Sequence, residues 1–253
     1  ITRDVIEKSN TLELIARPGT GVDNIDLIAA KDNAIPVFTS VEASTNSVAE
    51  LAIAFAISLS RSIPQADSKM KQGIWSKDTL MGNELKNKHF GIVGMGRIGR
   101  RTAQLAHALE MNVLAYEKLK IESSFRKKHN VKQVTLKQLL KKSDFVSLHL
   151  PFTKETNNII GKKELDLMKP SAYLINTARG QLISEKDLHV HLKNSRIAGA
   201  ALDVFSVEPP KNKDTIRLSN VIATPHIGAQ IIEAQKEASL VIAQKIIKYF
   251  SKS

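Results

Sequence analysis

Short apolar runs alternate with stretches of helical period along most of the chain. Apolar runs bounded by turn residues are typical of buried strands, whereas apolar positions three and four apart indicate helices. We expect strands at 90–94, 112–116, 144–149, 172–176, 197–203 and 220–223. We expect helices between them, at 97–109, 121–128, 135–141, 162–168 and 184–194. This alternation predicts an α/β fold built on a parallel sheet.

The two ends of the chain differ from this regular part. Strands at 12–16 and 35–38 enclose a short helix at 25–30, and a long helix is expected at 229–250. The stretch 44–72 is helical and apolar on most sides, which predicts a buried helix. Pro64 should break it into two segments, because proline disrupts a helix interior.

Composition and charge narrow the class of protein. The chain has 253 residues, 42% of them hydrophobic, which is enough for one large or two small cores. It contains no cysteine, no bilayer-length apolar run and nothing like a signal peptide at Ile1, so we expect a cytoplasmic protein without membrane contact. The net charge of +12 comes largely from scattered lysines with few aromatic neighbours, which favours a solvated surface and anionic small ligands over nucleic acid.

A glycine motif follows the expected strand at 90–94 and opens the helix at 97–109. Gly94 allows a tight turn, Gly96 lets the backbone approach a pyrophosphate, and Gly99 lets helix and strand pack closely. Glu117 ends the next strand, where an acid can accept hydrogen bonds from ribose hydroxyls and repel a 2′-phosphate. Such glycines also make ordinary turns, but this context predicts a site for NAD rather than NADP, with Lys118 and Lys120 as nearby opposing charges.

Three later strands each end at a charged or titratable residue, and ligands bind at such strand ends in open parallel sheets. Arg179 can bind a substrate carboxylate through both guanidinium nitrogens. His226 can accept and return a hydroxyl proton, and a carboxylate from the segment that contains Asp203 and Glu208 would orient its ring and favour its charged form. Each residue alone could be structural. Together they favour the oxidation of a hydroxy acid.

The chain resembles the D-isomer-specific 2-hydroxyacid dehydrogenase family along essentially its whole length. Besides the glycine motif, the segments 143–151 (SDFVSLHLP) and 168–180 (MKPSAYLINTARG) carry the resemblance. It implies that Arg179, Glu208 and His226 are catalytic. It implies cofactor contacts at the following residues: Thr20, Gly94, Gly96, Arg97, Ile98, Gly99, Glu117, Leu150, Thr177, Ala178, Asp203, His226 and Gly228. It implies substrate contacts at Gly19, Thr20, Gly21, Arg179 and His226.

The resemblance also implies a domain organisation. A Rossmann-type, doubly wound NAD-binding domain is expected at 44–226. A discontinuous, flavodoxin-like substrate domain is expected from 1–43 and the returning helix at 227–253. By the same resemblance, the first part of the substrate domain would precede Ile1, and no regulatory domain would follow Ser253.

Within the family, the segments 17–26, 73–75, 81–85 and 200–205 most resemble D-3-phosphoglycerate dehydrogenases, which act at the entry to serine biosynthesis. Two positions depart from that pattern: Glu117 replaces an aspartate, and Leu150 stands where threonine is common. The alternatives are a glyoxylate or hydroxypyruvate reductase and, more remotely, an NAD-sensing transcriptional corepressor. The stretch around Trp75 and Met81 argues against the corepressor.

Other features predict partners and exclude metals. His189 and His191 are two residues apart on an expected helix, so they face different directions and make a poor metal pair. We expect both at the surface and no bound metal. The resemblance implies a homodimer or higher homo-oligomer, with the buried helix at 44–63 as a contact.

Overall fold

The computed structural model describes residues 1–211 and 213–251, which form two compact units. Unit 1 consists of Ile1–Ser47 and Gly228–Ser253, and unit 2 consists of Val48–Ile227. Both are α/β, so the predicted fold class is confirmed.

Unit 2 is built on a parallel sheet of seven strands in the order β5-β4-β3-β6-β7-β8-β9. The strands are β3 (His89–Val93), β4 (Asn112–Tyr116), β5 (Val131–Gln133), β6 (Phe145–Leu148), β7 (Tyr173–Asn176), β8 (Gly199–Leu202) and β9 (Val221–Ala223). All six strands expected after residue 90 are present. The edge strand β5 was not predicted, because it has three residues and exposes Lys132, which leaves no apolar run.

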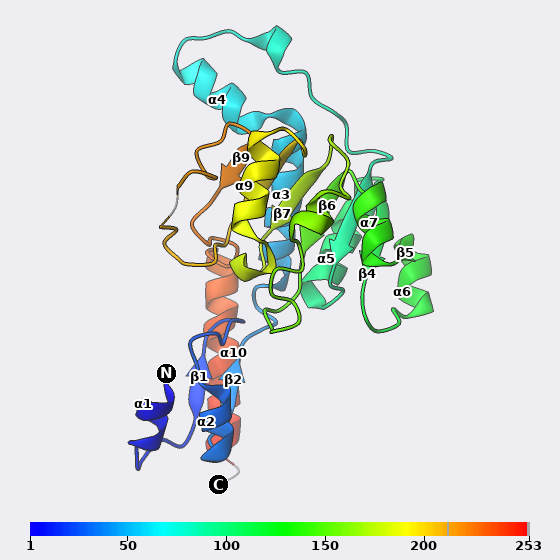
Figure 1. Ribbon diagram of the computed structural model, residues 1–253. Coiled ribbons are helices and arrows are strands. Elements are labelled where there is room, and N and C mark those ends of the chain that lie inside the picture. Colours follow the sequence, from blue (N-terminus) through cyan, green and yellow to red (C-terminus); the bar gives the residue numbers. More distant parts are fainter. Residues whose placement is uncertain (212, 252–253) are drawn as a thin grey trace. The chain divides into compact units, whose positions relative to one another are not determined.

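Helices cover both faces of this sheet, as Figure 1 shows for α3 and α9. The helices that follow residue 44 in this part of the chain are α3 (Thr45–Arg61), α4 (Ile63–Lys71), α5 (Arg97–Ala108), α6 (Ser123–Lys128), α7 (Leu136–Lys142), α8 (Lys162–Leu165) and α9 (Glu185–Lys193), with short 3-10 turns η1 (Lys77–Thr79) and η2 (Gly180–Leu182). The predicted break near Pro64 is confirmed: Ser62 has φ 50°, and α4 bends 63° from α3. No single helix in the described ranges is long and apolar enough to cross a membrane; only α3 and α4 taken together meet that criterion, across their bend.

Alternate residues of each strand face two separate cores. Phe90, Ile92 and Ile175 pack with helices α3 and α5, whereas Val93 and Leu174 pack with α7 and α9. A strand that is buried on both faces needs apolar residues at nearly every position. This requirement explains the continuous apolar runs in the sequence.

Unit 1 contains a two-stranded parallel sheet of β1 (Ile15–Arg17) and β2 (Val37–Thr39). Its helices are α1 (Arg3–Glu7), α2 (Leu27–Asp32) and α10 (Ile232–Phe250). The returning helix α10 packs on both strands, and Lys245 Nζ donates a 2.6 Å hydrogen bond to the Thr39 carbonyl. The C-terminal helix therefore belongs to the same compact unit as the N-terminal strands.

Candidate active site

The glycine turn connects β3 to α5 at the carboxyl edge of the unit 2 sheet. Gly94 has φ +99°, a conformation that disfavours other residues. A Cβ added to Gly99 would lie 2.0 Å from the Gly94 carbonyl oxygen, so helix and turn can meet only without a side chain there. A Cβ on Gly96 would meet nothing within 4 Å. The turn is therefore tightly packed at both ends and open at Gly96, where the helix amides begin.

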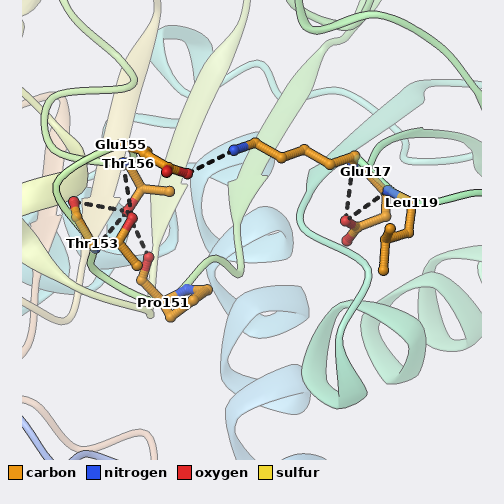
Figure 2. Close-up of polar contacts among 7 residues, drawn as sticks. Glu117, Leu119, Pro151, Thr153, Glu155 and Thr156 are labelled. Carbon is orange, nitrogen blue, oxygen red and sulfur yellow. Dashed lines mark hydrogen bonds and ion pairs between the residues drawn. The ribbon is translucent and has the colours of Figure 1, made fainter.

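Glu117, directly after β4, lies against this turn. Its Oε2 accepts a 2.8 Å hydrogen bond from the Met95 amide. Its Oε1 accepts one of 2.8 Å from the Lys118 amide (Figure 2). Sequence reasoning placed Glu117 at the strand end but missed its contact with Met95, which no local pattern indicates. A carboxylate oxygen has more than one lone pair, so Glu117 can still accept from ribose hydroxyls.

The loop after β7 presents Arg179. Asn176 fixes this loop, because its side chain accepts from the Ala178 amide at 3.1 Å and donates to the Arg179 carbonyl at 2.8 Å. A Cβ on Gly180 would lie 1.9 Å from the Phe205 carbonyl carbon. Gly180 therefore permits the loop that carries Arg179 to touch the chain that follows β8 and leads to Glu208.

His226 and Glu208 form the closest contact among the predicted catalytic residues. His226 Nδ1 lies 2.7 Å from Glu208 Oε2, and the two side chains are 49% and 38% exposed. An ionised carboxylate can only accept hydrogen bonds, so Nδ1 carries the proton. In the neutral ring, Nε2 then holds the lone pair, which suits a general base. Glu208 is itself positioned by the Phe205 amide, which donates to its Oε1 at 3.1 Å.

Asp203, which is 1% exposed, holds the histidine segment in place. Its carbonyl accepts from the His226 amide at 2.9 Å, and its Oδ1 accepts from the Ile227 amide at 2.8 Å and from the Thr224 hydroxyl at 2.6 Å. These bonds maintain His226 at φ +54°, a conformation that few non-glycine residues adopt. Asp203 was predicted as a cofactor contact, and its contacts in this structure support His226.

The remaining residues predicted to contact the cofactor surround the same edge of the sheet. Arg97 and Ile98 begin α5, and Leu150 follows β6 beside the turn, where its Cδ2 would lie 2.9 Å from a Cβ on Gly94. The Thr177 hydroxyl after β7 is buried without a hydrogen-bond partner in the described part of the chain. A dinucleotide fits this arrangement, since it offers phosphate to the helix amides and polar groups to Thr177.

Four residues predicted to contact the cofactor or the substrate belong to unit 1: Gly19, Thr20, Gly21 and Gly228. Gly19, Thr20 and Gly21 follow the carboxyl end of β1, where the Gly19 carbonyl accepts from the Ser40 amide at 3.1 Å. The Thr20 hydroxyl lies 3.0 Å from the Ser44 hydroxyl. Gly228 belongs to unit 1 and is buried. Gly19, Thr20 and Gly21 thus form a polar turn at the carboxyl end of β1.

Two other histidines, His191 and His149, each lie close to a polar side chain. The expectation of a surface position for His191 is wrong: it is 1% exposed, and its Nε2 lies 3.0 Å from Asp166 Oδ1. Helix α9 packs against α8, so the face of α9 that carries His191 is covered. His149 follows β6, and its Nε2 lies 2.9 Å from the Ser147 hydroxyl oxygen. Burial of its imidazole lowers the pKa of His149 to about 3.

A parallel sheet with a glycine turn after one strand and an acid at the end of the neighbouring strand has the architecture of a dinucleotide-binding domain. The family model described as "D-isomer specific 2-hydroxyacid dehydrogenase, NAD binding domain" matches residues 53–228. The chain therefore belongs to the D-isomer-specific 2-hydroxyacid dehydrogenase family, which confirms the resemblance and the expected NAD cofactor.

Individual relatives place the chain within that family. It is 44% identical over 249 residues to the D-3-phosphoglycerate dehydrogenase of Methanocaldococcus jannaschii, covering 98% of this chain and 47% of the relative. It is 41% identical to the hydroxypyruvate reductase of Thermotoga maritima, covering 98% of this chain and 81% of that enzyme. The solved structure of the acyclic imino acid reductase Bsp5 with NADPH and D-Arg is 35% identical, with a TM-score of 0.92 over 100% of this chain and 80% of that one. The chain thus spans about half the length of the first of these relatives.

The low pKa of His149 predicts a specific loss of stability in acid. The unfolded histidine takes up a proton below about pH 6.5, whereas the folded one stays neutral down to about pH 3, so stability falls as the pH drops through this range. We expect this one residue to cost about 1–2 kcal/mol at pH 4.5, less than the full shift would give, because its side chain is partly exposed. Urea unfolding of the wild type and of His149→Gln at pH 7 and 4.5 measures the effect. The variant should lose less stability on acidification, and equal losses in both proteins would contradict the prediction.

Proposed function

We propose that the protein is an NAD-dependent D-2-hydroxyacid dehydrogenase in which Arg179, Glu208 and His226 are catalytic. The observation that carries this proposal is the 2.7 Å contact between His226 Nδ1 and Glu208 Oε2, at the same sheet edge as the glycine turn. A histidine whose Nδ1 is bound by a carboxylate is oriented to use Nε2 on a substrate. Family membership supplies independent support.

In this mechanism, Arg179 binds the substrate carboxylate through two guanidinium nitrogens and orients the hydroxyl-bearing carbon. His226 Nε2 removes the hydroxyl proton while the carbon–hydrogen bond breaks and the carbonyl forms. When bound at the glycine turn, NAD would supply the acceptor for the hydride that leaves this carbon. Glu208 stabilises the imidazolium that results, and in the reverse direction His226 returns its proton to the new hydroxyl oxygen.

For the substrate, we propose D-3-phosphoglycerate, which would be oxidised to 3-phosphohydroxypyruvate, the first step of serine biosynthesis. The identity of 44% to a named D-3-phosphoglycerate dehydrogenase supports it. A second candidate is hydroxypyruvate or glyoxylate reduction, because the chain covers 81% of a relative named hydroxypyruvate reductase. Both candidates use the same catalytic residues and differ in the group that the side pocket must hold.

The proposal also gives each unit a ligand to bind and names NAD as the nucleotide. Unit 2 would bind NAD, and unit 1, with its Gly19–Thr20–Gly21 turn, would bind the substrate carboxylate. We propose NAD rather than NADP because Glu117 places a negative charge at the ribose end of the site. A cytoplasmic location would follow from this metabolic role.

Removal of the proton carrier tests the proposed chemistry. His226→Ala should reduce kcat by a factor of about 10²–10⁴, the usual contribution of general acid–base catalysis, while NADH binding stays within about threefold of the wild type. Glu208→Gln keeps a hydrogen-bond acceptor beside Nδ1 and should lose less. Steady-state kinetics and NADH fluorescence titrations provide both measurements. If His226→Ala keeps near-wild-type kcat, another group carries the proton.

A substrate panel separates the two candidates. With NAD, we expect kcat/KM for D-3-phosphoglycerate to exceed those for D-glycerate and D-lactate by about 100-fold, because charge-assisted contacts to a phosphate contribute several kcal/mol. The increase in NADH absorbance follows oxidation, and its decrease follows hydroxypyruvate and glyoxylate reduction. A preference for hydroxypyruvate over phosphorylated substrates would favour the second candidate and leave the class of enzyme unchanged.

We further propose a homodimer that forms through α3, α4 and the segment that follows them, which extends away from the sheet of unit 2 (Figure 1). Helix α4 has no buried residue. Six large apolar side chains are exposed between residues 57 and 81: Ile57, Ile63, Met70, Ile74, Trp75 and Met81. Trp75 is 77% and Met81 is 92% exposed, and such clusters commonly mark protein interfaces.

Light scattering at micromolar concentration tests the dimer. The double variant Trp75→Ser, Met81→Ser should raise the dimer Kd at least about tenfold, since aromatic anchors dominate interfaces. Val190→Ser, at a 42% exposed position on α9, is the matched control and should remain dimeric. A monomeric wild type would refute the dimer, and an unaffected double variant would refute this interface.

A further inference from the structure

An ion pair joins two segments at the carboxyl edge of the unit 2 sheet. Lys118 Nζ lies 2.9 Å from Glu155 Oε2, as Figure 2 shows beside Glu117. Lys118 follows β4 and Glu155 follows β6, and these strands pair with β3 on its two sides. Because the glycine turn follows β3, the ion pair links the two chain segments that flank the turn.

Glu155 lies in a turn after β6 that is held together by hydrogen bonds of the neighbouring Thr156. The Thr156 hydroxyl accepts from the Thr153 amide at 2.8 Å and donates to the Pro151 carbonyl at 2.8 Å. Thr156 itself is buried, at 8% exposure. These bonds hold the backbone of the turn that carries Glu155, whose own side chain is 76% exposed and is reached by the long lysine side chain from the other segment.

The Lys118 end lies next to the acid that marks the ribose end of the site. The Lys118 amide donates to Glu117 Oε1 at 2.8 Å, which fixes its backbone while its side chain stays 67% exposed. A 2′-phosphate on a ribose held at Glu117 would lie within reach of a lysine attached to the next residue. A phosphate carries nearly two negative charges and needs such a cation. In this structure that cation is bound to Glu155.

We propose that Glu155 is a positioning residue for cofactor choice: by holding the Lys118 ammonium, it withholds the cation that a 2′-phosphate would need and so strengthens the preference for NAD over NADP. The inference rests on the proposed binding of a dinucleotide at the glycine turn. It adds a second acid, far from Glu117 in sequence, to the residues that select the nucleotide. Its effect is modest, because both partners are largely exposed and such pairs are weak.

The test compares four forms of the full protein: wild type, Glu155→Gln, Lys118→Met and the double variant. Fluorescence titrations give the Kd for NADH and for NADPH. Glu155→Gln should lower the ratio of the NADPH Kd to the NADH Kd by about three- to tenfold, because Lys118 becomes available to the phosphate. In the double variant this gain should disappear, and in the single variant it should shrink in 0.5 M salt.

A matched control is available at the opposite, amino edge of the same sheet. Lys86 Nζ and Glu110 Oε2 form a 2.8 Å ion pair that is 56% and 65% exposed, next to the amino ends of β3 and β4. Glu110→Gln removes a similar pair away from the site and should leave the ratio unchanged.

The outcomes distinguish a failure of the role proposed for Glu155 from a failure of the proposed dinucleotide site. If the wild type binds NADH but the ratio is unchanged in Glu155→Gln, the role of Glu155 is wrong and the proposed function stands. A gain that survives the loss of Lys118 also refutes it, and Lys120 would then be the cation. If the wild type binds neither nucleotide, the dinucleotide site fails, and this inference fails with it.

Discussion

The parallel register of the seven-stranded sheet is the constraint on which the rest of unit 2 depends. Because every strand runs in the same direction, the chain leaves each one at the same edge. The glycine turn after β3, Glu117 after β4, Arg179 after β7 and His226 after β9 therefore gather at one edge although they lie far apart in the sequence. The apolar faces of the strands fix this register, since a shift by one residue would exchange the two cores.

Within that edge, the geometry of the proposed catalytic residues is set by residues that have no proposed part in the chemistry. Asp203 is buried beneath His226 and holds its backbone, and Gly180 admits the loop after β8 close to Arg179. The histidine is thus oriented by two carboxyl residues with different tasks. Asp203 determines where the chain runs, and Glu208 determines which ring nitrogen carries the proton.

The sequence predicted the elements well and the contacts between them poorly. Apolar periodicity located every long strand of unit 2 and the break at Pro64, because burial on both faces leaves a strong local pattern. It missed β5, which has three residues at the edge of the sheet, and it misplaced His191 at the surface.

The same holds for the candidate site: its residues could be predicted from the sequence, and the contacts between them could not. Residue types at strand ends indicated Arg179, Glu208 and His226. The bond from Met95 to Glu117 and the close approach at Gly180 join segments 22 and 25 residues apart, and such contacts leave no trace in a local pattern. They become visible only when the sheet brings the strand ends together.

The central claim, that this sheet edge carries out hydride transfer at the hydroxyl-bearing carbon of a 2-hydroxy acid, is tested most directly by isotope transfer. The full protein would reduce hydroxypyruvate or 3-phosphohydroxypyruvate with NADH dideuterated at C4 of the nicotinamide, and mass spectrometry would locate the label in the product. The account predicts one deuterium on C2 of the hydroxy acid. A product whose C2 carries only solvent hydrogen would contradict it.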